Sequence, residues 1–222
     1  MDQFTLSTVK HLVITGASGG LGKAIAEEFA AAFWGIAAPT HGELDVTDSA
    51  AIQGYFNSRP VDLLICAAGI IRDAPLSRLN ESAWDEVIAV NYHGAAACAA
   101  AALPQMIEKQ SGHVIFISSY SAIHPPRGQA AYATAKAALL GLTTNFAQRN
   151  GRHGVRVNAI LPGFIETPMT ESVSVKRRVE VLSDHALGRF NTSATVARFI
   201  HHLHDELIHT SGQVFQLDSR IS

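Results

Sequence analysis

Three polar side chains between residues 118 and 136 have the types and the spacing of a proton-transfer site. Tyr132 and Lys136 are four residues apart, and the Ala-rich run that follows favours helix, so both project from one helical face. An ammonium beside a phenol stabilises the phenolate, so we expect Lys136 to lower the tyrosine pKa from its usual value of about 10. Ser119 ends a β-rich run and could hydrogen-bond the substrate oxygen that Tyr132 protonates. This arrangement suits the reduction of a carbonyl.

A Tyr-x-x-x-Lys pair also arises by chance, as two solvated polar residues, so the elements around it must decide. A short apolar strand at 11–15 leads into a turn with glycines at 16, 20 and 22, and a helical pattern follows at 23–32. Strand, glycine loop and helix in this order form a phosphate-binding unit, because the backbone can approach a pyrophosphate and the helix N-terminus supplies N–H groups. The alternative is an ordinary glycine-rich turn.

Strands and helices alternate along the rest of the chain. The run 61–69 is almost continuously apolar and ends in glycine, which is typical of a central parallel strand covered on both faces. We therefore expect one α/β domain over residues 1–222, with a doubly wound parallel sheet. Further strands are expected at 113–117, 155–160 and 213–217, with helices at 81–90, from Asn91 to about 109, from Tyr132 onward and at 193–203.

One connection is too short for this pattern. The apolar run 33–38 is followed after about four residues by Glu43–Val46, whereas two parallel strands need a crossover of a dozen or more residues. The sequence thus predicts that the crossover helix between the second and third strands is missing, and that 43–46 is a stub or a strand without its partner helix. Thr47 and Asp48 then cap a helix at 49–58.

Composition excludes several classes of protein. With 222 residues, 47% hydrophobic and 16% charged, the chain can bury a sizeable core. A net charge of −2 provides no basic field for nucleic acid or an anionic membrane. Cys66 and Cys98 lack metal-ligand spacing and are expected to be buried reduced thiols. The first ten residues lack a signal-peptide pattern and the Ala-rich run 94–103 is too short to span a bilayer, so we expect a cytoplasmic protein.

Six motifs stand in the order and spacing of one known family, over nearly the whole chain. They are TGASGGLG at Thr15–Gly22, Asp45-Val46, Asn91, Ser119, Tyr132 with Lys136, and PGFIET at Pro162–Thr167. On these residues the chain resembles the short-chain dehydrogenase/reductase family. The resemblance implies a Rossmann fold and an oxidoreductase that interconverts an alcohol and a ketone or aldehyde with NAD(P)(H).

The resemblance also implies roles for four catalytic residues. Tyr132 would be the general acid in reduction and the base in oxidation, while Ser119 orients and polarises the substrate carbonyl. Lys136 would bind the nicotinamide ribose and lower the tyrosine pKa. Asn91 would hold a water that links Lys136 to solvent; the alternative for Asn91 is a polar residue inside a helix.

Cofactor contacts follow from the same resemblance. The glycine loop would meet the pyrophosphate, Asp45 and Val46 the adenine, and the segment after residue 161 the nicotinamide. The expected cofactor-binding residues are Gly16, Ser18, Gly20, Leu21, Gly22, Thr40, Asp45, Val46, Ala68, Gly69, Tyr132, Lys136, Pro162, Gly163, Ile165 and Thr167.

NADP(H) is expected rather than NAD(H). An NAD site usually has a carboxylate at the end of the second strand to accept from the ribose 2′-OH, and residues 38–41 carry none. Thr40 and His41 could instead bond a 2′-phosphate. Glu43 or Asp45 opposes this, because the short connection could bring either carboxylate close enough to repel the phosphate.

The chain departs from the family at Ala67, where Cys66-Ala67-Ala68-Gly69 replaces the usual Asn-Asn-Ala-Gly. The loss of that amide removes a hydrogen bond that would brace the sheet.

His201, His202, His204 and Asp205 could suggest a metal site, but a solvated helix face explains them and no metal is expected.

Two other functions remain open at this point. One is a protein that senses NADP(H) without turnover, although a sensor has no need for Ser119, Tyr132 and Lys136 together. The other is an epimerase or dehydratase of a nucleotide sugar, which usually needs a larger C-terminal domain than the roughly 60 residues after Pro162.

The substrate is expected to be a small carbonyl or alcohol. Two Ala-rich helices and the resemblance predict a homodimer or homotetramer.

Overall fold

The computed structural model describes residues 9–221, and its strands form one parallel sheet in the order β2-β1-β3-β4-β5-β6. The strands are β1 His11–Thr15, β2 Gly35–Ala37, β3 Leu63–Cys66, β4 Gly112–Ile117, β5 Val155–Leu161 and β6 Val214–Gln216. The α-helices are α1 Gly20–Ala31, α2 Ser49–Asn57, α3 Glu81–Ile88, α4 Ala95–Glu108, α5 Ala130–Asn150, α6 Val175–Ser183 and α7 Ser193–Asp205. The predicted doubly wound parallel sheet is confirmed.

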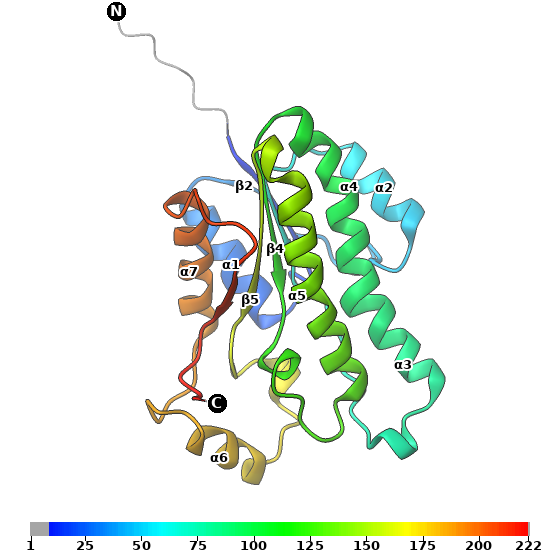
Figure 1. The fold of residues 1–222 in the computed structure, drawn as a ribbon, viewed down its shortest axis with the longest axis vertical. Helices are drawn as coiled ribbons and strands as arrows, with labels where there is room; N and C mark the ends of the chain where they lie inside the picture. Colours follow the sequence, from blue (N-terminus) through cyan, green and yellow to red (C-terminus); the bar gives the residue numbers. More distant parts are fainter. Residues whose placement is uncertain (1–8, 222) are drawn as a thin grey trace, which may run out of the picture.

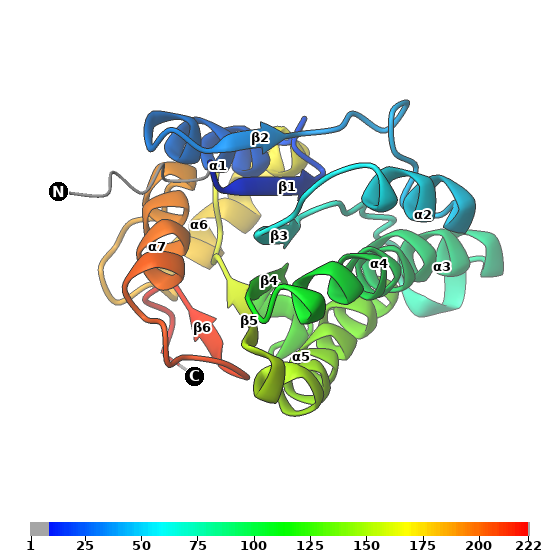
Figure 2. The same ribbon diagram turned by 90° about the horizontal axis from the view of Figure 1, so that it is seen from above.

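Helices cover both faces of the sheet (Figures 1 and 2). On one face α2, α4 and α5 pack over a core that includes Phe56, Met106 and Phe116. On the other face α1 and α7 enclose a second core that includes Phe29 and Ile200. Every residue of β3 and β4 is buried, which explains why their sequences are apolar without alternation.

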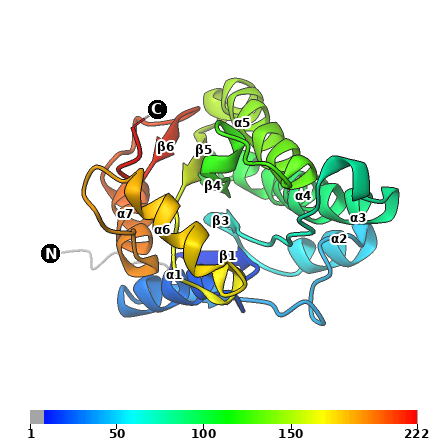
Figure 3. The same cartoon turned by 90° about the horizontal axis from the view of Figure 1, so that it is seen from below.

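The chain changes direction across the sheet between β1 and β3. From β1 it moves to β2 on one side, and α2 returns it to β3 on the other side. Loops that leave neighbouring strands in opposite directions open a crevice at the carboxyl ends of the strands, where α/β proteins of this kind bind ligands. Helix α6 lies at that end of the sheet (Figures 1 and 3).

The prediction of a missing crossover helix is not confirmed. Residues 43–46 form turns and no strand, so there is no crossover between β2 and this segment from which a helix could be missing, and α2, close to the predicted helix at 49–58, joins β2 to β3. Two contacts bend the segment away from the sheet edge. The Asp45 carboxylate accepts hydrogen bonds from the N–H and hydroxyl of Thr47, and Leu44 and Val46 are buried in the core beside α2 and α4. Burial of these side chains favours the turn over pairing with β2.

The helical run Glu81–Glu108 is long and apolar enough, by length and composition, to cross a membrane, with a mean hydropathy of 1.3 in its most apolar window. In the structure α4 packs on the sheet, with Cys98, Ala99 and Ala102 fully buried. A buried core helix meets the same criteria of length and hydropathy, so this feature is weak evidence for a membrane span.

A pair of histidines packs near the amino end of β4. Asn158 Oδ1 accepts from the N–H of Gln213 at 3.0 Å, so Asn158 Nδ2 faces His113 Nε2, also at 3.0 Å. His113 Nε2 is therefore an acceptor, and His113 Nδ1–H donates to His204 Nδ1 at 3.2 Å. A proton on that nitrogen of His204 would set two N–H groups against each other.

We expect this pair to make folding sensitive to acid. Burial, followed by the charges of Arg156 and Lys10, lowers the pKa of His204 from 6.5 to about 4. The unfolded chain then takes up a proton near pH 6.5 that His204 does not bind in the folded protein. The contribution of His204 to stability is therefore fully present above that pH, and roughly 3 kcal/mol of it is lost as the pH drops toward 4. Urea unfolding at about pH 7 and pH 5 measures the loss. His204→Gln should reduce it, and His202→Gln, at an exposed position of α7, should not.

Candidate active site

Ser119 and Tyr132 come together at the carboxyl end of β4. Tyr132 lies in the first turn of α5, and Ser119 lies two residues after β4, before the short 3₁₀ turn η3 (Tyr120–Ala122). The Ser119 Oγ accepts from the N–H of Ser121 at 3.1 Å, which leaves its hydroxyl proton free to be donated. A hydrogen bond from Ser119 favours the ionised form of the Tyr132 phenol. The two hydroxyl groups can therefore face one substrate oxygen.

The direction predicted for the tyrosine pKa is wrong. Burial raises the pKa of Tyr132 above 10, the Ser119 hydrogen bond only partly offsets this, and the negative charge of Asp73 raises it further. The Lys136 ammonium lies 5.7 Å from the centre of the tyrosine ring and donates instead to the carbonyl of Ile117 at 2.8 Å. In this structure the phenol is held protonated, which is the form that a general acid needs.

Lys136 is buried beside Asn91 and Gly69. The lysine is 4% exposed, and burial lowers its pKa to about 8. Asn91 lies in a π-helical turn, Ala89–Gly94, and its Nδ2 donates to the carbonyls of Ile70 and Val87. Within the described residues, Asn91 Oδ1 is buried without a hydrogen-bond partner. A Cβ at Gly69 would lie 2.6 Å from this oxygen and 3.6 Å from Lys136 Nζ.

The predicted phosphate loop has the shape of a cradle. Gly16 has a φ of +74°, and a Cβ there would lie 2.5 Å from the backbone nitrogen of Ala68. A Cβ at Gly22 would meet Gly16 O at 2.7 Å, and one at Gly20 would meet Thr167 Cγ2 at 2.9 Å. At Gly16 and Gly22 these contacts are with backbone atoms, so only glycine permits the packing there. The loop ends at the N-terminus of α1, whose first N–H groups lack helical partners.

The segment Pro162–Thr167 meets the glycine loop through Thr167. Asn191 Nδ2 donates to the carbonyl of Pro162 at 3.1 Å and also to Leu217 O, which joins this segment to the end of the chain. Gly163, with a φ of +85°, packs against the Asp218 side chain. Ile165 is buried. The predicted nicotinamide segment is thus held on the same side of the crevice as the loop.

The residues predicted to contact the adenosine half of the cofactor lie outside the cluster of Ser119, Tyr132 and Lys136. Val46 is buried and contacts Gly94 in the π-helical turn, where a Cβ would lie 2.8 Å from Val46 Cγ2. Thr40 is exposed, and both its N–H and its hydroxyl donate to Glu43 Oε2, at 2.8 and 2.9 Å. These bonds lower the pKa of Glu43. The Glu43 carboxylate therefore occupies the Thr40 donors that were predicted to bind the 2′-phosphate of NADP(H).

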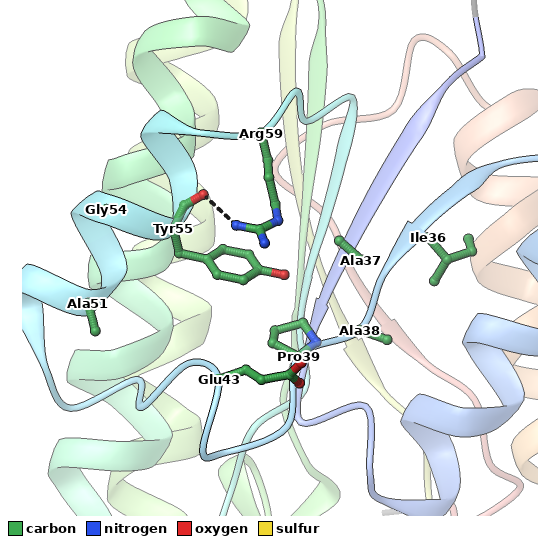
Figure 4. A pocket seen from close by; sticks show the side chains of 9 residues that line it. All are labelled: Ile36, Ala37, Ala38, Pro39, Glu43, Ala51, Gly54, Tyr55 and Arg59. Atoms are coloured by element: carbon green, nitrogen blue, oxygen red, sulfur yellow. Dashed lines mark hydrogen bonds between the residues drawn. The ribbon is translucent and has the colours of Figure 1, made fainter.

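An open cavity of about 650 Å³ adjoins this carboxylate (Figure 4). The end of β2 forms one wall, and Tyr55 of α2 forms the other with Arg59 stacked over its ring at 3.9 Å. Tyr55 and Arg59 were not predicted from the sequence, because only the fold brings the end of α2 opposite β2. The remaining lining residues are Ile36, Ala37, Ala38, Pro39, Glu43, Ala51 and Gly54.

The other predicted residues lie in or next to the loop. Ser18 is exposed, whereas the side chain of Leu21 is half-buried against the core beside α1. Ala67, at the position of the expected amide, packs on the same core, and its N–H donates to Thr15 O at 3.1 Å. The adjacent Ala68 N–H reaches the buried Thr15 hydroxyl at 3.4 Å. The sheet is therefore braced here by Thr15.

The histidines of α7 take part in other contacts. His201 hydrogen-bonds Glu28 of α1 at 3.0 Å and lies 3.1 Å from Asp205, and His204 meets His113. Among residues 9–221 no group of three or more His, Cys, Asp or Glu side chains could hold a metal ion.

Comparison with known proteins decides the family. The model of the short chain dehydrogenase family matches residues 40–178. The 3-oxoacyl-(acyl-carrier-protein) reductase FabG of Escherichia coli is 32% identical, over 94% of this chain and 96% of that protein. The chain belongs to the short-chain dehydrogenase/reductase family. It is an oxidoreductase that acts on carbonyl or CH–OH groups.

Two further relatives add detail to this short-chain dehydrogenase/reductase. FabG of Thermotoga maritima is 42% identical over 159 residues, which cover 71% of this chain and 65% of that protein. A protein of Beutenbergia cavernae, provisionally assigned as an NAD(P)-dependent gluconate 5-dehydrogenase and solved with NADP at low occupancy, matches with a TM-score of 0.89. Its sequence is 28% identical, and the match covers 95% of each chain.

Proposed function

We propose that this protein is an NADP(H)-dependent reductase of 3-oxoacyl groups. The observation that carries the proposal is the convergence of Ser119, Tyr132 and Lys136 beside Gly69, at the carboxyl end of the sheet. The names of the FabG relatives support the substrate class, and the NADP of the Beutenbergia cavernae protein supports the cofactor. A dinucleotide fits the glycine cradle, and the buried Asn91 Oδ1, which has no partner among the described residues, suits the water that the resemblance assigns to Asn91.

Each residue then has a defined task. Tyr132 donates its phenolic proton to the substrate oxygen, and Ser119 donates a hydrogen bond to that same oxygen and stabilises its developing charge. Lys136 holds the ribose, and Asn91 holds the water that links Lys136 to solvent. Gly16 and the α1 N-terminus hold the pyrophosphate, and the segment that ends at Thr167 meets the nicotinamide. When bound, the nicotinamide supplies the hydride. Asp45 and Val46 would meet the adenine.

A substrate panel tests the proposal. Purified protein with NADPH is offered an acetoacetyl thioester or 5-ketogluconate, and the loss of reduced-nicotinamide absorbance is followed. We expect turnover of the thioester to exceed that of the sugar acid. Turnover of 5-ketogluconate alone would mean that the substrates are sugar acids and not 3-oxoacyl groups. Binding of NADPH without turnover of any carbonyl would favour a protein that senses NADP(H).

Glu43 is expected to limit the preference for NADPH. Its carboxylate occupies the Thr40 N–H and hydroxyl, where a 2′-phosphate would be repelled. Glu43→Gln keeps an oxygen acceptor but removes the charge, so NADPH should bind about three- to fivefold more tightly while NADH binding stays unchanged. Fluorescence titration with both cofactors measures the ratio, and Glu108→Gln, at an exposed site on α4, is the matched control. Equal gains for the two cofactors would contradict this interpretation.

We also propose a cytoplasmic homodimer or homotetramer. The resemblance and the small side chains of α4 and α5, which permit close helix packing, support this assembly. Sedimentation at micromolar concentration should therefore give a mass that is a multiple of 23.7 kDa, and a monomer mass would contradict the proposal.

A further inference from the structure

Three side chains for which the sequence predicted no role form a hydrogen-bonded series beside Ser119. Gln129 Nε2 donates to Asp73 Oδ2 at 2.7 Å, and the Ser121 hydroxyl donates to Gln129 Oε1 at 2.9 Å. The N–H of Ser121 then donates to Ser119 Oγ at 3.1 Å. The series starts in the loop after β3, passes the residue before α5 and ends at the serine after β4.

The donors and acceptors of this series have one consistent direction. The Asp73 carboxylate can only accept when ionised, so it fixes the amide nitrogen of Gln129 toward itself and the amide oxygen toward Ser121. That oxygen makes the Ser121 hydroxyl a donor. Because Ser119 Oγ accepts from the Ser121 N–H, the Ser119 hydroxyl proton is left for Tyr132 or for a substrate oxygen. A second link holds the same segments together, since the Ala74 N–H donates to Gly128 O at 2.9 Å.

We propose that Asp73 and Gln129 are positioning residues, which act through Ser121 to aim the Ser119 hydroxyl at the reacting oxygen. The proposal rests on the proposed function, because the aim of Ser119 matters only for a carbonyl that Tyr132 protonates. Displacing a hydroxyl that stabilises a developing oxyanion by about 1 Å can cost about 10²-fold in rate.

The charge of Asp73 has a second effect on the site. It raises the pKa of Tyr132 and so helps to keep the acid protonated. The other groups at the phenol are the Ser119 hydroxyl, whose hydrogen bond lowers this pKa, and the Lys136 ammonium at 5.7 Å from the ring centre. Asp73→Asn removes the charge and retains an oxygen that can accept from Gln129.

A charge swap tests the series by activity. Gln129→Glu at mildly alkaline pH sets two carboxylates against each other, and we expect kcat to fall about 10²-fold while the KM for NADPH changes less than about twofold. Adding Asp73→Asn restores the bond in reverse, because the new amide at position 73 donates to the new carboxylate at position 129, which still accepts from Ser121. The double variant should recover to within about threefold of the wild type. Gln148→Glu, an exposed position on α5, is the matched control.

Two outcomes of that experiment would overturn the inference. One is a Gln129→Glu enzyme that keeps more than about a third of its kcat, and the other is a double variant no faster than Gln129→Glu alone. Rescue through Asp73→Asn also separates positioning from a general loss of fold, which Tm measurements on each variant check.

A measurement without turnover separates this inference from the proposed function. The phenolate absorbance of Tyr132 is titrated against pH, using Tyr132→Phe as the blank for the other three tyrosines. Asp73→Asn should ionise Tyr132 at lower pH than the wild type, because it removes the negative charge that opposes the phenolate. An unchanged titration would contradict the effect of the Asp73 charge on Tyr132, whether or not any carbonyl is reduced. Absence of turnover in the wild type would overturn the proposed function and leave this charge effect standing.

Discussion

Tyr132→Phe is expected to lower kcat by about 10²–10⁴-fold while NADPH affinity stays within about twofold of the wild type. The substitution keeps the ring and its packing at the start of α5, but it deletes the phenolic proton. It also removes the partner of the Ser119 hydroxyl. The glycine cradle is untouched, so binding of the pyrophosphate should not change. Steady-state rates with any accepted carbonyl and fluorescence titration with NADPH measure the two effects.

The control for this variant is Tyr92→Phe, which removes a hydroxyl from the π-helical turn without touching Ser119 or Lys136. It should leave kcat nearly unchanged. If the Tyr132→Phe enzyme retains more than about a tenth of its rate, the proton comes from another group.

Some elements could be predicted closely because local sequence determines them. The strand at 11–15 and the buried strand after residue 61 are apolar runs that only a sheet covered on both faces accommodates, and both were found. The π-helical turn at Ala89–Gly94 was not foreseen, because its residues continue a helical pattern on either side. Its geometry follows from tertiary contacts, in which Asn91 bonds Ile70 O and Gly94 packs on Val46.

In the candidate site, too, features set by local sequence could be predicted and features set by tertiary contacts could not. Motif spacing predicted that Ser119, Tyr132 and Lys136 converge, and their catalytic roles stay predictions. The pKa direction of Tyr132 was wrong because the sequence shows the neighbouring lysine but neither the burial of the phenol, which raises its pKa, nor the bond that turns the Lys136 ammonium to Ile117 O. Asp73 and Gln129 were missed because they meet across 56 residues of chain. The prediction of a missing crossover helix was not confirmed, because residues 43–46 do not form a strand and Leu44 and Val46 are instead buried in the core.

Lys136→Met is expected to lower turnover strongly without unfolding the protein. The ammonium is buried, hydrogen-bonds Ile117 O and lies near Gly69, where the ribose would be held. Its loss should therefore lower kcat by about 10²-fold or more and weaken NADPH binding by about tenfold, unlike Tyr132→Phe.

The same burial predicts the effect on stability. The pKa of Lys136 is about 8 when folded and 10.5 in the unfolded chain, so between these values the unfolded chain binds the extra proton. Wild-type stability should fall as the pH drops from about 10.5 to 8 and remain level below. Methionine removes this roughly 3 kcal/mol penalty, against about 1 kcal/mol for the lost bond to Ile117 O. Urea unfolding near neutral pH should then show a variant at least as stable as the wild type, and a clearly less stable variant would mean that the ammonium holds the fold as well as the cofactor.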